Sequence, residues 1–394
     1  MRTSLHLVAA AVAVALVSCK AQDPVIKTVT DTASAMLSDQ IAAIDATGKI
    51  LFPNTITEDG SVKYIGHRDW RVGFFPGTLW CMYELTGEEK WKNEAERFTE
   101  ALEDVQYLTS HHDIGFMIGS SYLRGYRDTG KQEYIPIIIQ SAKSLCTRFR
   151  PGAGVIQSWD ADKGWQGTRG WECPVIIDNM MNLELLFEAS KLSGDESFRN
   201  VAVSHADKTL ENHFREDASC CHVVDYEIET GKVRSHQTAQ GYAHESSWSR
   251  GQAWALYGYT MCYRYTSDPR YLEHARKVAA FILNHPRLPE DLVPYWDFDA
   301  PGIPDEPRDA SAAAIIASAL YELEGYSPDN GYRQKADKIV ESLATDAYLA
   351  RRGTNGNFIL MHSVGSIPHG NEIDVPLSYA DYYYLEALTR RARK

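Results

Sequence analysis

The chain is short of positive charge, and no lysine and arginine cluster in its 394 residues is long enough to follow a phosphate backbone. With 53 acidic and 40 basic residues, the net charge is −13. This balance excludes nucleic acid as an expected partner, and it would repel a long polyanion in bulk. We therefore expect any anionic substrate to be small and to be held by local cationic or amide groups.

Cysteine is scarce, and none of it has the paired spacing with histidine that zinc sites show. Apart from Cys19, the cysteines lie mostly inside apolar helical patterns, which predicts buried free thiols. They are Cys81, Cys146, Cys173, Cys220, Cys221 and Cys262. Neither a metal site nor a disulfide framework is predicted.

Long apolar runs are also missing, except for residues 7–17, which are too few to span a bilayer as a mature helix. This run ends in Leu-Val-Ser-Cys at Cys19 and is typical of a signal peptide. The tetrad resembles a bacterial lipobox, in which cleavage leaves the cysteine as the lipid-carrying first residue. We predict a lipoprotein signal peptide over residues 1–18, a tether over 19–24 and one domain over 25–394. The protein would then be lipid-anchored in the periplasm or outer membrane, although an ordinary secretory signal with a chance cysteine is the alternative.

Five segments repeat one pattern, in which a helix ending in an aromatic residue meets a turn rich in Gly or Asp and a second helix opened by an aromatic. They are residues 83–91, 126–134, 187–198, 263–271 and 321–332. Paired helices that recur along a chain are the signature of a closed or stacked helical array. The second helix of each pair is amphipathic, so we expect it outside, whereas the first is more apolar and rich in small residues, so we expect it inside.

A sixth inner helix is predicted over residues 377–388, and the N-terminal helix over 25–44 would be its partner. Twelve helices in six hairpins, closed by pairing the two ends of the chain, make an all-α fold, the (α/α)6 barrel. A linear solenoid is the alternative, and it would need polar capping helices that the sequence does not supply.

All inner helices of such a barrel start at one rim, so the residues before them should lie together. Five of the six starts carry an aspartate, namely Asp69, Asp113, Asp178, Asp309 and Asp374. Aspartate is a common helix N-cap, so position alone does not identify a catalytic group. Asp178 lies between Ile176-Ile177 and Met180-Met181, surroundings that keep a carboxyl protonated and suit a general acid. Asp113 likewise leads into an apolar run, whereas the other three resemble capping and packing contexts.

Tryptophans accompany these starts, and flat aromatic rings complement the C–H faces of sugars. They are Trp70, Trp159, Trp165, Trp171, Trp248 and Trp254. About half of them are expected to serve packing instead.

Blocks at residues 69–80, 111–116, 176–186, 240–242 and 247–254 resemble glycoside hydrolase family 88, the unsaturated glucuronyl hydrolases. The similarity extends from residue 69 to 388. The related unsaturated rhamnogalacturonyl hydrolases usually carry Asp-Asp in the second block, whereas here Asn179 follows Asp178.

The resemblance implies a hydrolase that releases a 4,5-unsaturated uronic acid from the non-reducing end of polysaccharide-lyase products. Asp178 would be the general acid and base, and Asp113 a second essential carboxylate that binds sugar hydroxyls. Substrate contacts would come from Trp70, His112, His222, Gln240, Arg250, Trp254, Ser363 and Ser366. His222 is placed by spacing alone.

Family members that favour 6-sulfated fragments carry an arginine before the glutamine and a Ser-x-x-Ser-x-Lys run. Ala239 and Pro368 stand at these positions here, so no 6-sulfate preference is expected.

The implied reaction protonates the C4=C5 bond and adds water at C5, and it needs no metal or organic cofactor. The expected partner is a small anionic unsaturated oligosaccharide, with no nucleic acid, and with membrane contact only through the lipid anchor. Two alternatives stay open: a conventional inverting glycosidase on the same barrel, and a non-catalytic lipoprotein that captures glycans.

Overall fold

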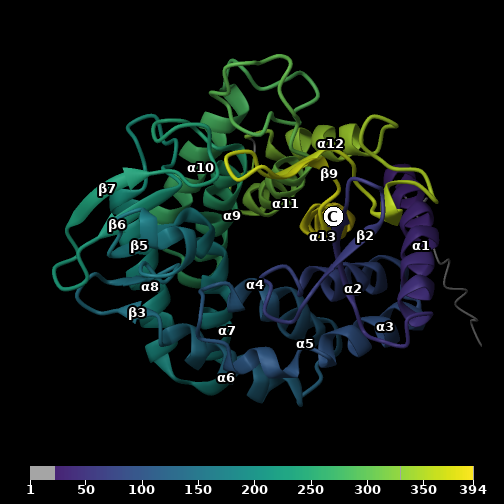
Figure 1. The fold of residues 1–394 in the computed structure, drawn as a ribbon, viewed down its shortest axis with the longest axis horizontal. Helices are drawn as coiled ribbons and strands as arrows, with labels where there is room; N and C mark the ends of the chain where they lie inside the picture. Colours follow the sequence, from purple (N-terminus) through teal and green to yellow (C-terminus); the bar gives the residue numbers. More distant parts are fainter. Residues whose placement is uncertain (1–22, 329, 394) are drawn as a thin grey trace, which may run out of the picture.

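The fold is a closed double ring of helices, as seen in a computed structural model that describes residues 23–328 and 330–393 (Figure 1). The inner ring consists of α2 (Phe74–Thr86), α4 (Ile114–Ile118) continued through a π-helical turn by α5 (Arg124–Thr129), α7 (Leu183–Ser193), α9 (Ser249–Thr266), α11 (Ala310–Tyr326) and α13 (Ser378–Ala392). The outer ring consists of α1 (Pro24–Asp45), α3 (Glu89–Glu100), α6 (Tyr134–Cys146), α8 (Glu196–Asn212), α10 (Pro269–Asn284) and α12 (Tyr332–Leu343). The predicted (α/α)6 barrel is therefore confirmed.

The repeated turns follow from helix capping. Gly87, Gly130 and Gly194 end α2, α5 and α7 in the left-handed conformation, with φ of 69°, 71° and 74°, which glycine adopts without steric cost. The outer helix that follows often starts on an aspartate. Asp268, for example, accepts the backbone N–H of Arg270 at 2.9 Å and precedes a proline at the first position of α10.

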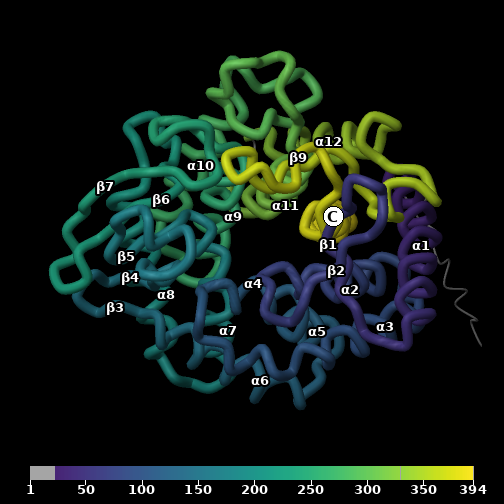
Figure 2. Tube along the Cα trace, in the orientation of Figure 1, coloured from purple at the N-terminus to yellow at the C-terminus, as the bar shows by residue number. Residues whose placement is uncertain are grey.

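The two ends of the chain meet and close the ring. The helix α13 packs between α11 and α2, and its Arg391 lies 2.8 Å from Asp23, the N-cap of α1. Further along α1, Gln40 donates a hydrogen bond to the carbonyl of Gly356 at 3.0 Å. Figure 2 shows the purple N-terminal helix beside the yellow-green C-terminal segment. A linear solenoid is excluded by this closure.

Short antiparallel strands decorate the rim where the inner helices begin, and the all-helical prediction did not include them. They are β1 (Phe52–Ile56) with β2 (Val62–Ile65), β3 (Phe149–Arg150) with β4 (Val155–Ile156), β5 (Cys173–Ile176) with β6 (Val223–Tyr226) and β7 (Val233–Gln237), and β8 (Ser363–Ser366) with β9 (Asn371–Val375). Each strand connects an outer helix to the next inner one, so the strands build walls around the mouth of the barrel.

A tight approach at the rim brings two inner-helix starts together. The backbone N–H of Phe116 donates to Asn182 Oδ1 at 2.9 Å. A Cβ on Gly115 would lie only 2.4 Å from the Asn182 Cα, so no larger residue fits there without displacement. This contact joins α4, which Asp113 precedes, to the 3₁₀ turn η4 (Ile177–Asn182), which carries Asp178.

The six cysteines within the described residues are free, and all but the half-buried Cys146 are buried, as predicted. Among the described helices, none is both long and apolar enough to cross a membrane. The predicted signal peptide and Cys19 lie outside the described residues.

Candidate active site

A cavity of about 350 Å³ opens at the strand-decorated rim. Four of the predicted site residues line it: Trp70, Gln240, Arg250 and Ser366. The other lining residues are Arg71, Trp159, Trp165, Gly365, His369, Asn371, Glu372 and Tyr379. Three tryptophans and the β8–β9 hairpin thus supply most of the cavity wall, and they meet where Trp165 packs on His369 with ring centroids 4.9 Å apart.

Asp113 occupies the N-cap position of α4, yet its side chain accepts no capping hydrogen bond. Instead, its two carboxylate oxygens lie 3.1 Å from His112 Nε2 and 3.4 Å from His111 Nδ1. Burial acts to raise the pKa of Asp113, but the two imidazoles outweigh it and hold the pKa well below its usual range. Asp113 is therefore an ionised carboxylate.

Asp178 lies half-buried in η4, and its buried Oδ2 has no hydrogen-bond partner among the described residues. Burial raises the pKa of Asp178 to about 7, against the opposing charge of Arg250 and with help from the negative charge of Asp113. The surroundings thus lower the pKa of Asp113 and raise that of Asp178. A pair of carboxyl groups with separated pKa values is typical of active sites in which one group acts as an acid and the other stays ionised. The prediction of a protonated Asp178 agrees with this environment.

Arg250 lies in the first turn of α9 and is held from several sides. It donates to the carbonyls of Val364 and Gly365 on β8, the latter at 2.8 Å. Its Nη1 also lies 3.3 Å from Asp309 Oδ2, a carboxylate that caps α11 through its other oxygen. The guanidinium therefore stands in a fixed orientation before any substrate arrives.

His222 and Gln240 are linked through the loop that precedes α9. Nδ1 of His222 accepts the backbone N–H groups of Ala239 and Gln240 at 3.0 and 3.2 Å, which places the ring proton of a neutral imidazole on Nε2. Burial and the charge of Arg250 lower the pKa of His222 well below its ordinary value, so the ring is neutral. The Gln240 amide donates to the Gly365 carbonyl at 3.2 Å, so the loop and β8 are joined.

The remaining predicted site residues do not line this cavity: Asp113, Asp178, His112, His222, Trp254 and Ser363. Trp254 is buried and packs behind Phe116, with ring centroids 5.2 Å apart, whereas Phe116 in turn packs on the cavity-lining Trp70 at 5.3 Å. Ser363 and His112 are fully buried, and His112 Nε2 lies 3.1 Å from an oxygen of Asp113. Their roles toward substrate stay predictions.

Sequence reasoning missed a polar group formed by residues distant in the chain. Arg71 pairs with Asp69 at 2.7 Å and with Glu372 from β9, and Arg71 and Glu372 line the cavity. Ser366 contacts His369 at 2.7 Å on the same hairpin. Arg71 directly follows Trp70, and Glu372 begins the last rim segment, but only the folded hairpin brings them together.

Comparison with known proteins assigns the family. Residues 49–392 match the family described as Glycosyl Hydrolase Family 88. An unsaturated glucuronyl hydrolase of Formosa agariphila is 47% identical over 342 residues, which is 86% of this chain and 84% of that protein. An unsaturated chondroitin disaccharide hydrolase of Streptococcus agalactiae is 33% identical over 86% of this chain and 85% of its own length.

Solved structures agree with these relatives. The crystal structure of an unsaturated glucuronyl hydrolase specific for heparin superposes with a TM-score of 0.89 at 46% identity, covering 94% of this chain and 98% of that one. The unsaturated glucuronyl hydrolase of Bacillus sp. GL1 gives a TM-score of 0.85 at 31% identity, covering 93% and 97%. The chain therefore belongs to glycosyl hydrolase family 88, the family of the unsaturated glucuronyl hydrolases.

Proposed function

We propose that this enzyme removes a 4,5-unsaturated uronic acid from the non-reducing end of small anionic oligosaccharides, with Asp178 as general acid and base. The observation that carries the proposal is the pair of half-buried carboxyl groups, in which Asp113 lies against His111 and His112 whereas Asp178 Oδ2 has no hydrogen-bond partner within the described part of the chain and the pKa of Asp178 is raised to about 7. A further support is a Streptococcus agalactiae relative, 31% identical, whose variant has been solved in complex with dGlcA-GalNAc6S.

The chemistry follows from the substrate's double bond. Because C4=C5 is attached to the ring oxygen, it is an enol ether and accepts a proton at C4. Asp178 delivers that proton, and positive charge develops at C5 and the ring oxygen. The resulting carboxylate then takes a proton from the water that attacks C5. The hemiketal so formed opens and releases the remaining sugar chain from C1.

The neighbouring residues have complementary tasks in this proposal. Asp113, as an acceptor-only carboxylate, binds sugar hydroxyls and keeps the pKa of Asp178 high. Arg250 and Gln240 present cationic and amide donors to the carboxylate and hydroxyls of the uronic acid. Trp70 lines the cavity and offers an aromatic face to the sugar ring.

The test compares the turnover of three kinds of substrate and the activity of two enzyme variants. We expect turnover of an unsaturated disaccharide and of its sulfur-linked analogue, because departure from C1 follows ring opening, and no turnover of saturated glucuronides. Asp178→Asn should abolish activity because an amide can neither give the proton to C4 nor accept one from water. Asp381→Asn is the matched control, because the pKa of Asp381 is also raised to about 7, but both of its oxygens accept backbone N–H groups, from Ile359 and Leu360, whereas Asp178 Oδ2 has no partner among the residues that the structure describes. Cleavage of saturated substrates with the thioglycoside spared would instead establish a conventional inverting glycosidase.

We further propose that Cys19 carries a lipid that anchors the enzyme in the periplasm or outer membrane. The support is the Leu-Val-Ser-Cys tetrad at the end of the apolar run. Globomycin, which blocks lipoprotein signal cleavage, or Cys19→Ala should leave the precursor uncleaved or move the enzyme from the membrane to the soluble fraction. Fractionation followed by immunoblotting measures this, with Cys146→Ala as the control. Normal processing together with a soluble wild type would refute the anchor.

A further inference from the structure

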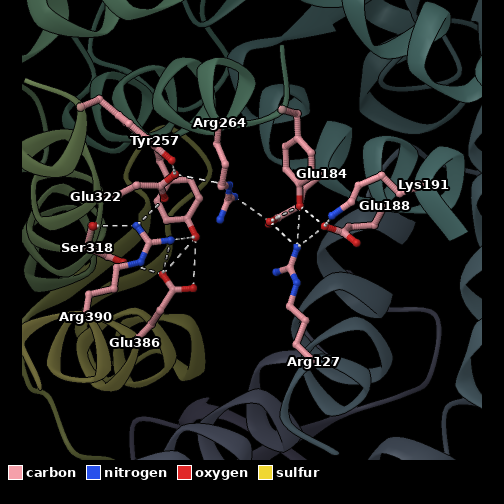
Figure 3. Close-up of polar contacts among 12 residues, drawn as sticks. Arg127, Glu184, Glu188, Lys191, Tyr257, Arg264, Ser318, Glu322, Glu386 and Arg390 are labelled. Atoms are coloured by element: carbon pink, nitrogen blue, oxygen red, sulfur yellow. Dashed lines mark hydrogen bonds and ion pairs between the residues drawn. The ribbon is translucent and has the colours of Figure 1, made fainter. Parts of the chain in front are cut away.

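A second cavity, of about 430 Å³, lies at the opposite end of the barrel, where the inner helices end. Six cationic and three acidic side chains line it, among them Arg127 on α5, Arg264 on α9 and Arg390 on α13. Figure 3 shows these arginines converging on one open space. The rings of Phe74 and Phe116, which pack under Trp70, lie between this space and the active site.

The carboxylates at this end are already occupied by protein donors. Glu184 accepts hydrogen bonds from Arg127 at 2.7 Å and from Arg264 at 2.6 Å. Glu386 accepts the hydroxyl groups of Tyr257 at 3.1 Å and Ser318 at 2.5 Å. A cation would have to displace these donors, so the acidic side chains do not form a cation site.

The guanidinium groups, by contrast, have N–H groups that make no hydrogen bond within the described residues. Each carries five N–H bonds, yet every hydrogen bond that Arg127 makes within the described residues leaves from Nη2. Arg264 donates from Nη2 to Glu184, and its buried Nε makes only an ion-pair contact of 3.4 Å with Glu322, without a hydrogen bond. A nitrogen of each of these two arginines points into the open space in Figure 3. The Arg127 side chain is 34% exposed and that of Arg264 30% exposed, so water can reach their unused N–H groups, and a ligand with several acceptor oxygens can replace that water.

We propose that this far-end cavity binds a small oxyanion through Arg127 and Arg264. A closed network of ion pairs would leave neither the space nor the unused donors. The lining is cation-rich, but Glu84, Glu184 and Glu322 behind it restore the balance. The choice of anion therefore depends on the positions of the N–H donors. A ligand with several acceptor oxygens can bind both arginines at once. Sulfate or phosphate and the carboxylate of a small sugar acid share this chemistry. Because net charge contributes little, we expect a Kd on the order of 1 mM.

The test measures anion-dependent thermal stability at constant ionic strength, with chloride as the reference. Sulfate, phosphate and glucuronate are compared at about 20 mM, and a rise in Tm of roughly 2 °C is expected for the preferred class. The double variant Arg127→Lys/Arg264→Lys keeps both charges but loses the planar forks, so the rise should disappear. Arg250→Lys at the active site should retain the rise, which separates the two cavities.

A rise with sulfate and phosphate would identify a tetrahedral anion, and a rise with glucuronate alone would identify a carboxylate. No rise with any of the three, or an equal rise in the double variant, would overturn the proposal. If the double variant does not fold, wild-type crystals soaked in selenate provide the decision. Selenium within hydrogen-bond distance of Arg127 and Arg264 supports the site, and water alone in the cavity refutes it.

Discussion

Asp113 and Asp178 begin equivalent inner helical segments, but their neighbours give them opposite protonation states. Two imidazoles lie within 3.4 Å of the Asp113 carboxylate, whereas Asp178 Oδ2 meets no polar partner among the described residues. The apolar residues that flank Asp178 in the sequence were sufficient to predict its raised pKa. The ionised state of Asp113 depends on how the His111 and His112 side chains fold back, which sequence spacing does not specify.

The coupling of these carboxyl groups predicts a pH profile. Asp178 must be protonated in the free enzyme, and its pKa is about 7, so kcat/KM should fall about tenfold per pH unit above that value. Asp113→Asn removes a negative charge that raises this pKa. The alkaline limb of the residual activity should therefore move to lower pH. Profiles of kcat/KM for both enzymes, with Asp374→Asn as a control at an exposed rim carboxylate, measure the displacement. An unmoved limb would show that Asp113 and Asp178 are not coupled.

At the scale of elements, the β8–β9 hairpin completes the site that the helices begin. Its Gly365 carbonyl accepts hydrogen bonds from both Arg250 and Gln240, and its Glu372 pairs with Arg71. Glu372 has a φ of 55°, an unusual conformation for a residue with a side chain and one often found at functional sites. The strands have only four and five residues and show no clear alternation, so helical periodicity was detectable in the sequence and this hairpin was not.

Gly365→Ala tests whether the hairpin positions the donors. The new Cβ would lie 2.6 Å from Glu372 Oε2 and 2.7 Å from its Cβ, so β8 and β9 must separate and carry the carbonyl away from Arg250. We expect kcat/KM to fall at least about tenfold, because misplacing a group by about 1 Å can be that costly, while Tm changes little. Gly325→Ala on α11, where nothing lies within 4 Å, is the control and should leave kcat/KM unchanged. Full activity of Gly365→Ala would mean that the hairpin only covers the site.

At the scale of the whole molecule, the repeats predicted the barrel and its polarity, because each helical pair leaves a local signature of turn and aromatic residues. They also predicted that the rim aspartates gather at one end. They could not predict which rim side chains turn inward, as the buried Trp254 and Ser363 illustrate. The repeats could not predict the far-end cavity either. Its arginines come from three inner helices, and the C-terminal ends of these helices come together only when the ring closes.

The contact that closes the ring is expected to contribute to stability. Asp23 caps α1 by accepting the N–H of Val25 at 3.0 Å, and the same carboxylate binds Arg391 of α13 at 2.8 Å, so one side chain joins the first helix to the last. Asp23→Ala should lower the free energy of unfolding in urea by about 1–2 kcal/mol. Asp195→Ala is the matched control, because Asp195 caps α8 at 2.9 Å from the N–H of Ser197 without bridging two helices. The excess loss for Asp23 should vanish in an Arg391→Ala background, and kcat/KM should be unchanged because the active site is at the other end of the barrel. Equal losses for the two variants would show that closure depends on apolar packing of α13 against α2 and α11, and that the ion pair contributes nothing to it.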